Sequence, residues 1–166
     1  DDYAHHPTEI RATLSAARTR FQQRPLWALF QPHTFSRTRA LLAEFADSLV
    51  AADHVVLMDI FPSREKDDGT VSSADILALL EHEHSHLVSA PEEVAHFLTA
   101  RLQPGDVLIT LGAGDVHKIG EQVLELRGDT SIVAEGASEP LFAHFGDRIR
   151  SQEPLARYTS ARIGGS

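Results

Sequence analysis

The sequence predicts an α/β fold with a mostly parallel sheet and helices on both of its faces. Short apolar runs alternate along the chain with longer segments of helical periodicity, and this alternation is typical of βαβ units. The apolar runs are nearly continuous, as in strands that are buried on both faces. Polar loops that contain glycine or proline follow several of these runs, as expected at strand ends.

The amino-terminal half contains two predicted helices and two predicted buried strands. Pro7 suits the first turn of a helix, and apolar residues then recur at helical spacing, which predicts a helix over about 7–23. The apolar runs at 26–30 and 54–60 are the two strands. Ser36 is placed to cap the helix between them. That helix is expected to carry its apolar residues on one side: Leu41, Leu42, Phe45, Leu49 and Val50.

The second half continues the alternation. Ser72 or Ser73 is expected to cap a helix, and a further helix opens at Pro91. The remaining predicted elements are a short strand near 86–88, a strand at 107–111 and a last helix that ends near 127–128. Together these elements predict a Rossmann-like sheet, in which ligands bind beyond the carboxyl ends of the strands. The residues after 128 contain only short apolar pieces and are expected to form an irregular C-terminal tail.

Composition excludes several classes of function. The 166 residues include 15 Lys and Arg against 24 Asp and Glu, and a net charge of −9 argues against general nucleic-acid binding. The absence of Cys excludes thiol catalysis and thiolate metal sites. No apolar run approaches the roughly 20 residues that a membrane helix needs, so no membrane association and a cytoplasmic location are expected. The chain opens on Asp1 without an initiator Met, so we expect a piece of a longer polypeptide.

The loop at 31–37 carries the first candidate binding residue. It follows a predicted strand and enters a helix, and Arg37 falls in the first turn of that helix. A cation is unfavourable there for the helix dipole, which suggests that a ligand carboxylate is held by the guanidinium group. The alternative is an ordinary surface arginine.

Two further segments have features of anion sites. Residues 1–7 place two carboxylates, a phenol and two imidazoles ahead of a helix, although Asp there is equally suited to capping. Gly112, Ala113, Gly114 and Asp115 offer backbone amides at a helix start. That loop is not a dinucleotide fingerprint, because His117 stands where the third glycine would be. The chain also lacks the phosphate-binding motif G-x-x-x-x-G-K-[ST].

Two polar segments can be interpreted either as functional sites or as ordinary solvent-exposed loops. The alternating histidines His82, His84 and His86 could share one strand face and bind a metal, but a solvated connector is the preferred interpretation and no metal is expected. The segment 59–65 follows another predicted strand, and a plain charged loop is as good an interpretation as a functional one.

Four segments, in their order and spacing, resemble the C-terminal domain of the Mur ligase family. They are DDYAHHPTEI, FQPHTFSRTRALLAEF, DIFPSREK and DVLITLGAGDVHKIG. The resemblance covers about residues 1–127 and is greatest to the members that add L-alanine. The start DDYAHHP is shared with the murein-peptide recycling ligase, whereas FQPHTFSRT resembles the alanine-adding members.

The resemblance implies a role in peptidoglycan biosynthesis. In this family ATP phosphorylates the carboxylate of UDP-N-acetylmuramate, the amine of L-alanine attacks the acyl phosphate, and Mg²⁺ screens the phosphates. The phosphate-binding loop and the UDP-sugar site belong to central and N-terminal domains that this chain lacks. The chain is therefore expected to be inactive alone, with no catalytic residue of its own assigned. The C-terminal domain closes over the site and contacts the amino acid.

By the same resemblance, His5, His33 and Arg37 form the L-alanine pocket, with Arg37 on the carboxylate. Asp2 corresponds to a position that meets the ATP ribose, and Tyr3 is expected near the nucleotide. Some relatives have a second arginine directly after the motif histidine, where this chain has a threonine, so a two-arginine clamp is not implied.

The last residues resemble a different enzyme. The stretch 153–166 is similar to the start of UDP-N-acetylenolpyruvoylglucosamine reductase, a flavoenzyme, which implies a ligase–reductase fusion with 128–152 as a linker. FAD is expected only if that reductase domain is complete, so none is predicted here. Two other hypotheses stay open: a non-catalytic binding module with the same fold, and a domain of the recycling ligase.

Overall fold

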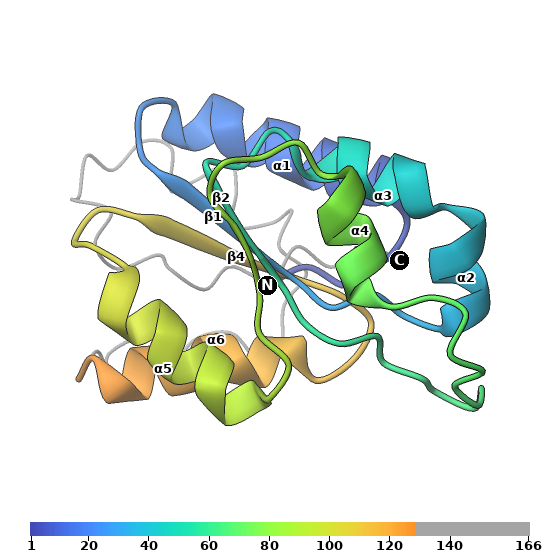
Figure 1. Ribbon diagram of the computed structural model, residues 1–166. Coiled ribbons are helices and arrows are strands. Elements are labelled where there is room, and N and C mark those ends of the chain that lie inside the picture. The colour runs from blue at the N-terminus through green and yellow to red at the C-terminus, as the bar shows by residue number, and fades with distance from the viewer. Residues whose placement is uncertain (129–166) are drawn as a thin grey trace.

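The structure is a computed structural model that describes residues 1–128. Four parallel strands form one sheet in the order β3-β2-β1-β4 (Figure 1). The strands are β1 (Leu26–Phe30), β2 (His54–Leu57), β3 (Ser85–Leu87) and β4 (Val107–Leu111). The predicted α/β class and the parallel sheet are therefore confirmed. The predicted tail, the linker from 129 onward and the reductase-like stretch lie outside the described residues, so the domain boundary at 127 stays a prediction.

Helices cover both faces of the sheet (Figure 1). One face carries α1 (Pro7–Phe21), α3 (Leu42–Leu49) and α4 (Ser73–Leu79), and the other carries α5 (Pro91–Arg101) and α6 (Val116–Leu126). The short helix α2 (Phe35–Ala40) follows β1 at the carboxyl end of the sheet.

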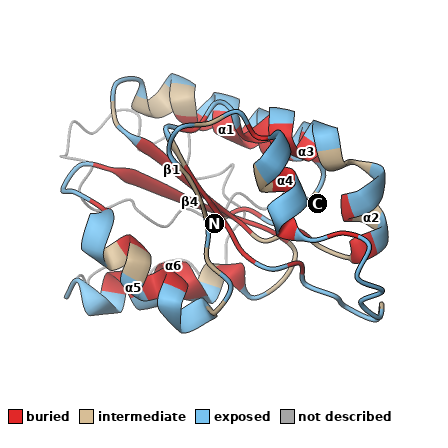
Figure 2. Cartoon of the chain, viewed as in Figure 1, coloured by how far each residue is buried: buried red, intermediate tan, exposed pale blue. Residues whose placement is uncertain are grey.

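Successive residues of the strands point to opposite faces, which divides the core into two layers. Leu26, Ala28 and Phe30 of β1 pack with the inner sides of α1, α3 and α4. Trp27 and Leu29 pack with α5 and α6. Figure 2 shows buried residues along the strands and on the helix sides that face them. A strand buried on both faces needs no polar alternation, which is why the apolar runs were readable in the sequence.

Four sequence predictions need correction. The first helix ends at Phe21, because Gln22 leaves the helical region with φ 31°. The second strand ends at Leu57 and not at residue 60. The helix expected after β1 is broken at Leu41 into α2 and α3, and Val50 is largely exposed. Ser36 is not the cap of that helix, because the cap position is Thr34.

Asp2 fastens the start of the chain to both β4 and α1. Its backbone N–H donates to the Thr110 carbonyl (2.8 Å), and its own carbonyl accepts from the Gly112 N–H (3.2 Å). Its carboxylate accepts from the Ala4 N–H (2.9 Å) and from the Thr13 hydroxyl. The side chain is buried, so these bonds hold the motif that begins the chain in a fixed place.

We expect Asp2→Ala to lower the free energy of unfolding by about 1–3 kcal/mol, because the Ala4 N–H and the Thr13 hydroxyl lose a buried acceptor. Urea denaturation followed by circular dichroism measures this. Asp2→Asn keeps one acceptor oxygen and should cost less. The control is Tyr3→Ala, since Tyr3 is exposed. A cost for Asp2→Ala no larger than that of the control would contradict this account.

The amino ends of the strands carry a stack of rings. His54 of β2 lies against Trp27 of β1, with centroids 4.0 Å apart and planes 12° apart, and His84 lies 5.0 Å from His54. The pKa of His54 is held below its ordinary value, first by burial and then by the nearby His84, while Asp53 and Asp106 act in the opposite direction. Burial also lowers the pKa of His33 and His86. The folded chain therefore favours neutral imidazoles at these three positions.

Because these pKa values are lowered on folding, the associated stability is present above the ordinary histidine pKa and is lost as the pH falls through the folded value. We predict that the chain becomes progressively less stable as the pH falls below about 6.5, the ordinary histidine pKa. Thermal melting by circular dichroism at a series of pH values tests this. His54→Asn should weaken the pH dependence, and His96→Asn, at an exposed site on α5, should not. Equal pH dependence in all three proteins would refute the prediction.

Candidate functional site

The order of the strands reverses between β1 and β4, which makes the crevice beyond their carboxyl ends the expected ligand site. The Gln31 N–H donates to the Leu111 carbonyl (3.0 Å), so the backbone segments that leave β1 and β4 are still paired where the strands end. A Cβ atom on Gly112 would lie 2.9 Å from the Gln31 carbonyl oxygen, and Gly112 has φ 147°. Only glycine fits this close approach, which brings the loop 112–115 against the loop after β1.

The loop after β2 joins the other two. Phe61 pairs with the loop after β1 through two backbone bonds of 2.8 Å, in which its N–H donates to Pro32 and its carbonyl accepts from Thr34. A Cβ atom on Gly114 would lie 3.5 Å from the Phe61 ring and 2.9 Å from the Gln31 side-chain oxygen. Loops that follow three different strands therefore meet around Phe61.

His33 lies at the centre of this cluster. Its ring stacks on Phe61 (centroids 5.6 Å apart, planes 17° apart) and meets His5 edge to face at 6.1 Å. The His5 ring in turn contacts Tyr3 at 5.2 Å, and His5 Nδ1 is hydrogen-bonded to the Tyr3 carbonyl (2.9 Å). The motif at the start of the chain and the motif after β1 thus come together in space.

Two nitrogen atoms in the cluster are buried without a hydrogen-bond partner. They are His33 Nδ1 and Arg37 Nη1. A buried donor without a partner is costly, and buried polar atoms in folded proteins are nearly always paired. Both atoms belong to residues that the family resemblance placed in an amino-acid pocket. An anionic ligand group would supply the missing acceptor for Arg37 Nη1, and for His33 Nδ1 in the tautomer that carries its proton there.

The electrostatics of the pair suit a single anion. Burial lowers the pKa of His33 from its ordinary value, and the positive charge of Arg37 lowers it further; Glu65 opposes this shift. His33 is therefore neutral at pH 7, and Arg37 supplies the one fixed positive charge of the pair. A neutral imidazole donates or accepts depending on its tautomer, so His33 suits either end of an amino acid.

The other candidate residues occupy different surroundings. The carboxylate of Asp2 already accepts two hydrogen bonds within the fold. Tyr3 is 58% exposed and free to meet a ligand or another domain. Asp115 is exposed and pairs with Lys118 at 3.0 Å. Of the loop 112–115, the glycines lie against the cluster, whereas the Asp115 carboxylate is turned to an ion pair outside it.

Phe61, Glu65 and Gln31 were not singled out by sequence reasoning. Phe61 and Glu65 lie in the segment DIFPSREK, whose position after a strand was the available signal. That signal could not show that Phe61 stacks on His33, because the two residues are brought together by the pairing of two loops.

The histidine-rich segment has a different environment. His82 Nε2 is hydrogen-bonded to the Ala52 carbonyl (2.9 Å), and His86 packs on Phe97 at 4.9 Å. Within residues 1–128, no three His, Asp or Glu side chains are grouped in a way that could hold a metal ion.

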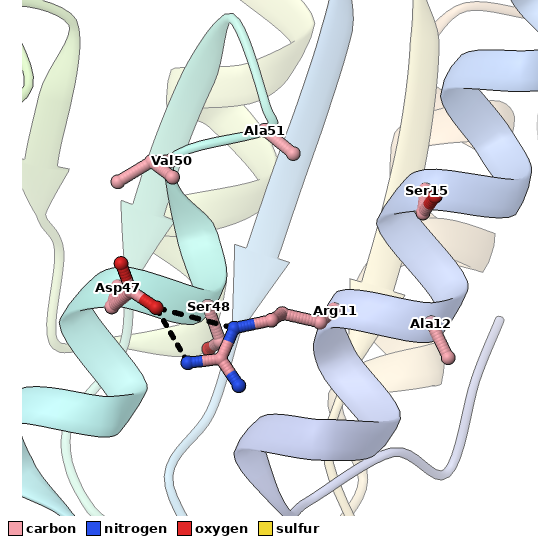
Figure 3. A pocket seen from close by; sticks show the side chains of 7 residues that line it. All are labelled: Arg11, Ala12, Ser15, Asp47, Ser48, Val50 and Ala51. Atoms are coloured by element: carbon pink, nitrogen blue, oxygen red, sulfur yellow. Dashed lines mark hydrogen bonds and ion pairs between the residues drawn. The ribbon is translucent and has the colours of Figure 1, made fainter.

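An open groove lies elsewhere, between α1 and α3 (Figure 3). It is crossed by the ion pair of Arg11 and Asp47 (2.5 Å), with Val50 and Ser15 among its walls. Its charged groups are already paired, and it is formed by helix surfaces and not by strand ends. The cluster around His33 is therefore the better candidate site.

Among residues 1–128, no helix combines the length and apolar character needed to cross a membrane.

Curated relatives with high identity are UDP-N-acetylmuramate–L-alanine ligases. The one from Alkaliphilus metalliredigens is 47% identical over 125 residues, which are 75% of this chain and 27% of that protein. The one from Agathobacter rectalis is 51% identical over 127 residues, which are 75% of this chain and 28% of that protein. The chain thus spans little more than a quarter of the length of these relatives.

Solved structures give the same picture of the fold. UDP-N-acetylmuramate–alanine ligase from Thermotoga maritima matches with a TM-score of 0.62 and 28% identity, over 78% of this chain and 26% of that one. A murein peptide ligase from Psychrobacter arcticus matches with a TM-score of 0.64 over 81% of this chain and 28% of that one; at 24% identity this likeness shows the fold alone. These matches lend no support to the reductase-like interpretation of 153–166.

Residues 1–114 match the family described as Mur ligase, glutamate ligase domain, and the chain therefore belongs to the Mur ligase family.

Proposed function

We propose that this chain is the acceptor-binding domain of an ATP-dependent, cytoplasmic ligase that joins L-alanine to UDP-N-acetylmuramate. The proposal is supported by the names of the relatives that are 47% and 51% identical to it. It takes the remainder of the ligase, with the N-terminal and central domains, to be supplied outside this chain, in keeping with the quarter of each relative that the chain spans.

The pair of buried, unpartnered nitrogens is the observation that carries the proposal. Arg37 Nη1 and His33 Nδ1 lie in the cluster where three strand-end loops meet. The carboxylate of L-alanine would accept from the Arg37 guanidinium group in a charge-assisted hydrogen bond. His33 and His5 would complete the contact. Held in this way, the amine would be oriented for attack, with water kept from the reacting carboxyl group by domain closure.

This chain is proposed to contact the nucleotide through few residues and to contribute no ligand to its metal. ATP would activate the acceptor's partner, the UDP-N-acetylmuramate carboxyl group, and Mg²⁺ would bind with the phosphates. The chain has no phosphate-binding loop, and its described residues hold no metal-binding group of three side chains. We therefore assign the phosphates, Mg²⁺ and the UDP-sugar to the domains outside this chain. Asp2 and Tyr3 remain proposed neighbours of the nucleotide, with Tyr3 the more accessible of the two.

In the complete ligase, Arg37→Ala should raise the KM for L-alanine between about tenfold and more than a hundredfold, because a hydrogen bond to a charged group is lost. The KM for ATP should change far less, since Arg37 is proposed to contact the amino acid alone. Steady-state kinetics with each substrate varied in turn measures both constants. An unchanged KM for L-alanine would remove Arg37 from the pocket.

The 166-residue chain by itself should release no phosphate from ATP in the presence of UDP-N-acetylmuramate and L-alanine. The reason is that the phosphate-binding and UDP-sugar sites lie in other domains. A phosphate-release assay against a blank without protein tests this. Release above the blank would show that the chain holds a complete active site.

The choice of acceptor separates this proposal from a recycling ligase with the same fold. The assignment to an alanine-adding ligase is the better supported, because relatives with that name are 47% and 51% identical to this chain. The complete ligase should therefore use L-alanine in preference to a tripeptide. Preference for the tripeptide would overturn the assignment of substrate and leave the family unchanged.

A further inference from the structure

Helix α2 carries Arg37 but has little local reason to form. It has six residues, and its first turn contains a cation and no acidic residue. Its cap residue, Thr34, makes no side-chain capping bond. Thr34 also has φ 67° and ψ 141°, a conformation that a residue with a branched side chain rarely adopts. The position of Arg37 must therefore be maintained by contacts from outside the helix.

Glu65 provides such a contact from the loop after β2. Its carboxylate accepts from the Ser36 N–H (2.8 Å) and, through its other oxygen, from the Ser36 hydroxyl. These bonds occupy the first turn of α2, where a negative charge is favourable for the helix dipole. The Ser36 hydroxyl, followed by the Ser36 N–H, lowers the pKa of Glu65, so the carboxylate is ionised at neutral pH. Glu65 thus acts as a cap supplied by a residue 29 positions along the chain.

The loop that presents Glu65 is itself tied to the site. The Glu65 N–H donates to the Pro62 carbonyl (3.0 Å), one residue after Phe61, whose ring stacks on His33. Beyond Glu65, Asp68 pairs with Arg39 of the same helix at 2.9 Å. The loop therefore holds α2 at two points and reaches His33 through Phe61.

Glu65 does not neutralise Arg37, the residue that is proposed to bind the ligand. In the described part of the chain, Arg37 makes no ion pair, and its Nη1 atom has no partner. Because the Glu65 carboxylate binds Ser36 and not Arg37, the guanidinium group of Arg37 stays available for an anion. Being negative, Glu65 would repel an acceptor carboxylate and is a poor direct contact for it.

We propose that Glu65 is a positioning residue, which fixes α2 through Ser36 and thereby holds Arg37 and His33 ready for the acceptor carboxylate. This inference rests on the proposed function for its ligand. The capping role itself is independent of the ligand and can be measured separately.

The kinetic test uses the complete ligase with Glu65→Ala, Glu65→Gln, Ser36→Ala and the double variant Ser36→Ala/Glu65→Ala. Glu65→Ala should raise the KM for L-alanine about three- to tenfold, the scale of a lost helix cap, with the KM for ATP within about twofold. Glu65→Gln keeps an acceptor oxygen and should restore part of the loss. Ser36→Ala should have less effect in the Glu65→Ala background than in the wild type, because the two residues act together. The matched control is Asp67→Asn, a carboxylate of the same loop that accepts from the Gly69 N–H.

Amide hydrogen exchange on the 166-residue chain gives a readout that needs no activity. Glu65→Ala should speed exchange at Ser36 and Arg37, and Asp67→Asn should not. If exchange in α2 is unchanged by Glu65→Ala, or if the KM values for L-alanine and ATP rise together, the positioning role is wrong. If the wild-type ligase fails to use L-alanine, the proposed function fails, while the exchange result still decides whether Glu65 caps α2.

Discussion

Backbone hydrogen bonds continue past the last residues of the strands, and the arrangement of the site depends on them. Gln31 stays paired with Leu111, and Phe61 stays paired with Pro32 and Thr34. The loops at the carboxyl edge therefore extend the pairing of the sheet. Between the loops after β1 and β2 the register shifts by one residue, since Phe30 pairs with Leu57 but His33 pairs with Phe61. The pairing places the loop that enters α2, and side chains of the loop after β2 hold the helix itself, through the bonds from Ser36 to Glu65 and the ion pair of Arg39 and Asp68. A helix of six residues depends on such contacts more than on its own stability.

The sequence predicted those parts of the fold that local pattern controls. The strands at 26–30 and 107–111 were found to the residue, because a buried strand is a continuous apolar run. Pro7 and Pro91 marked two helix starts correctly. The break at Leu41 was missed, since apolar residues continue across it at helical spacing; it shows only in the backbone, where Leu41 has φ −122° and ψ 27°.

The candidate site was predictable to the same limited extent. Arg37 could be named from its place in the first turn of a helix after a strand end, whereas His33 was named only through the family resemblance. That His33 Nδ1 and Arg37 Nη1 are buried without partners could not be predicted, because burial depends on loops from other strands. The bonds from Ser36 to Glu65 join residues 29 positions apart, and no periodicity signals such a pair. Long-range polar contacts are thus where the structure adds most to the sequence.

The ring stack at the opposite edge of the sheet has a practical consequence. Trp27 is the only tryptophan among the 166 residues, and it lies at the amino end of β1 against His54. The proposed acceptor site begins after the carboxyl end of the same strand. Intrinsic fluorescence of this chain therefore reports on unfolding and on the protonation of a neighbouring imidazole, while an amino acid bound near His33 would go unseen. The fluorescence of Trp27 is thus an intrinsic probe of folding, and it is separated from the proposed binding site by the length of one strand.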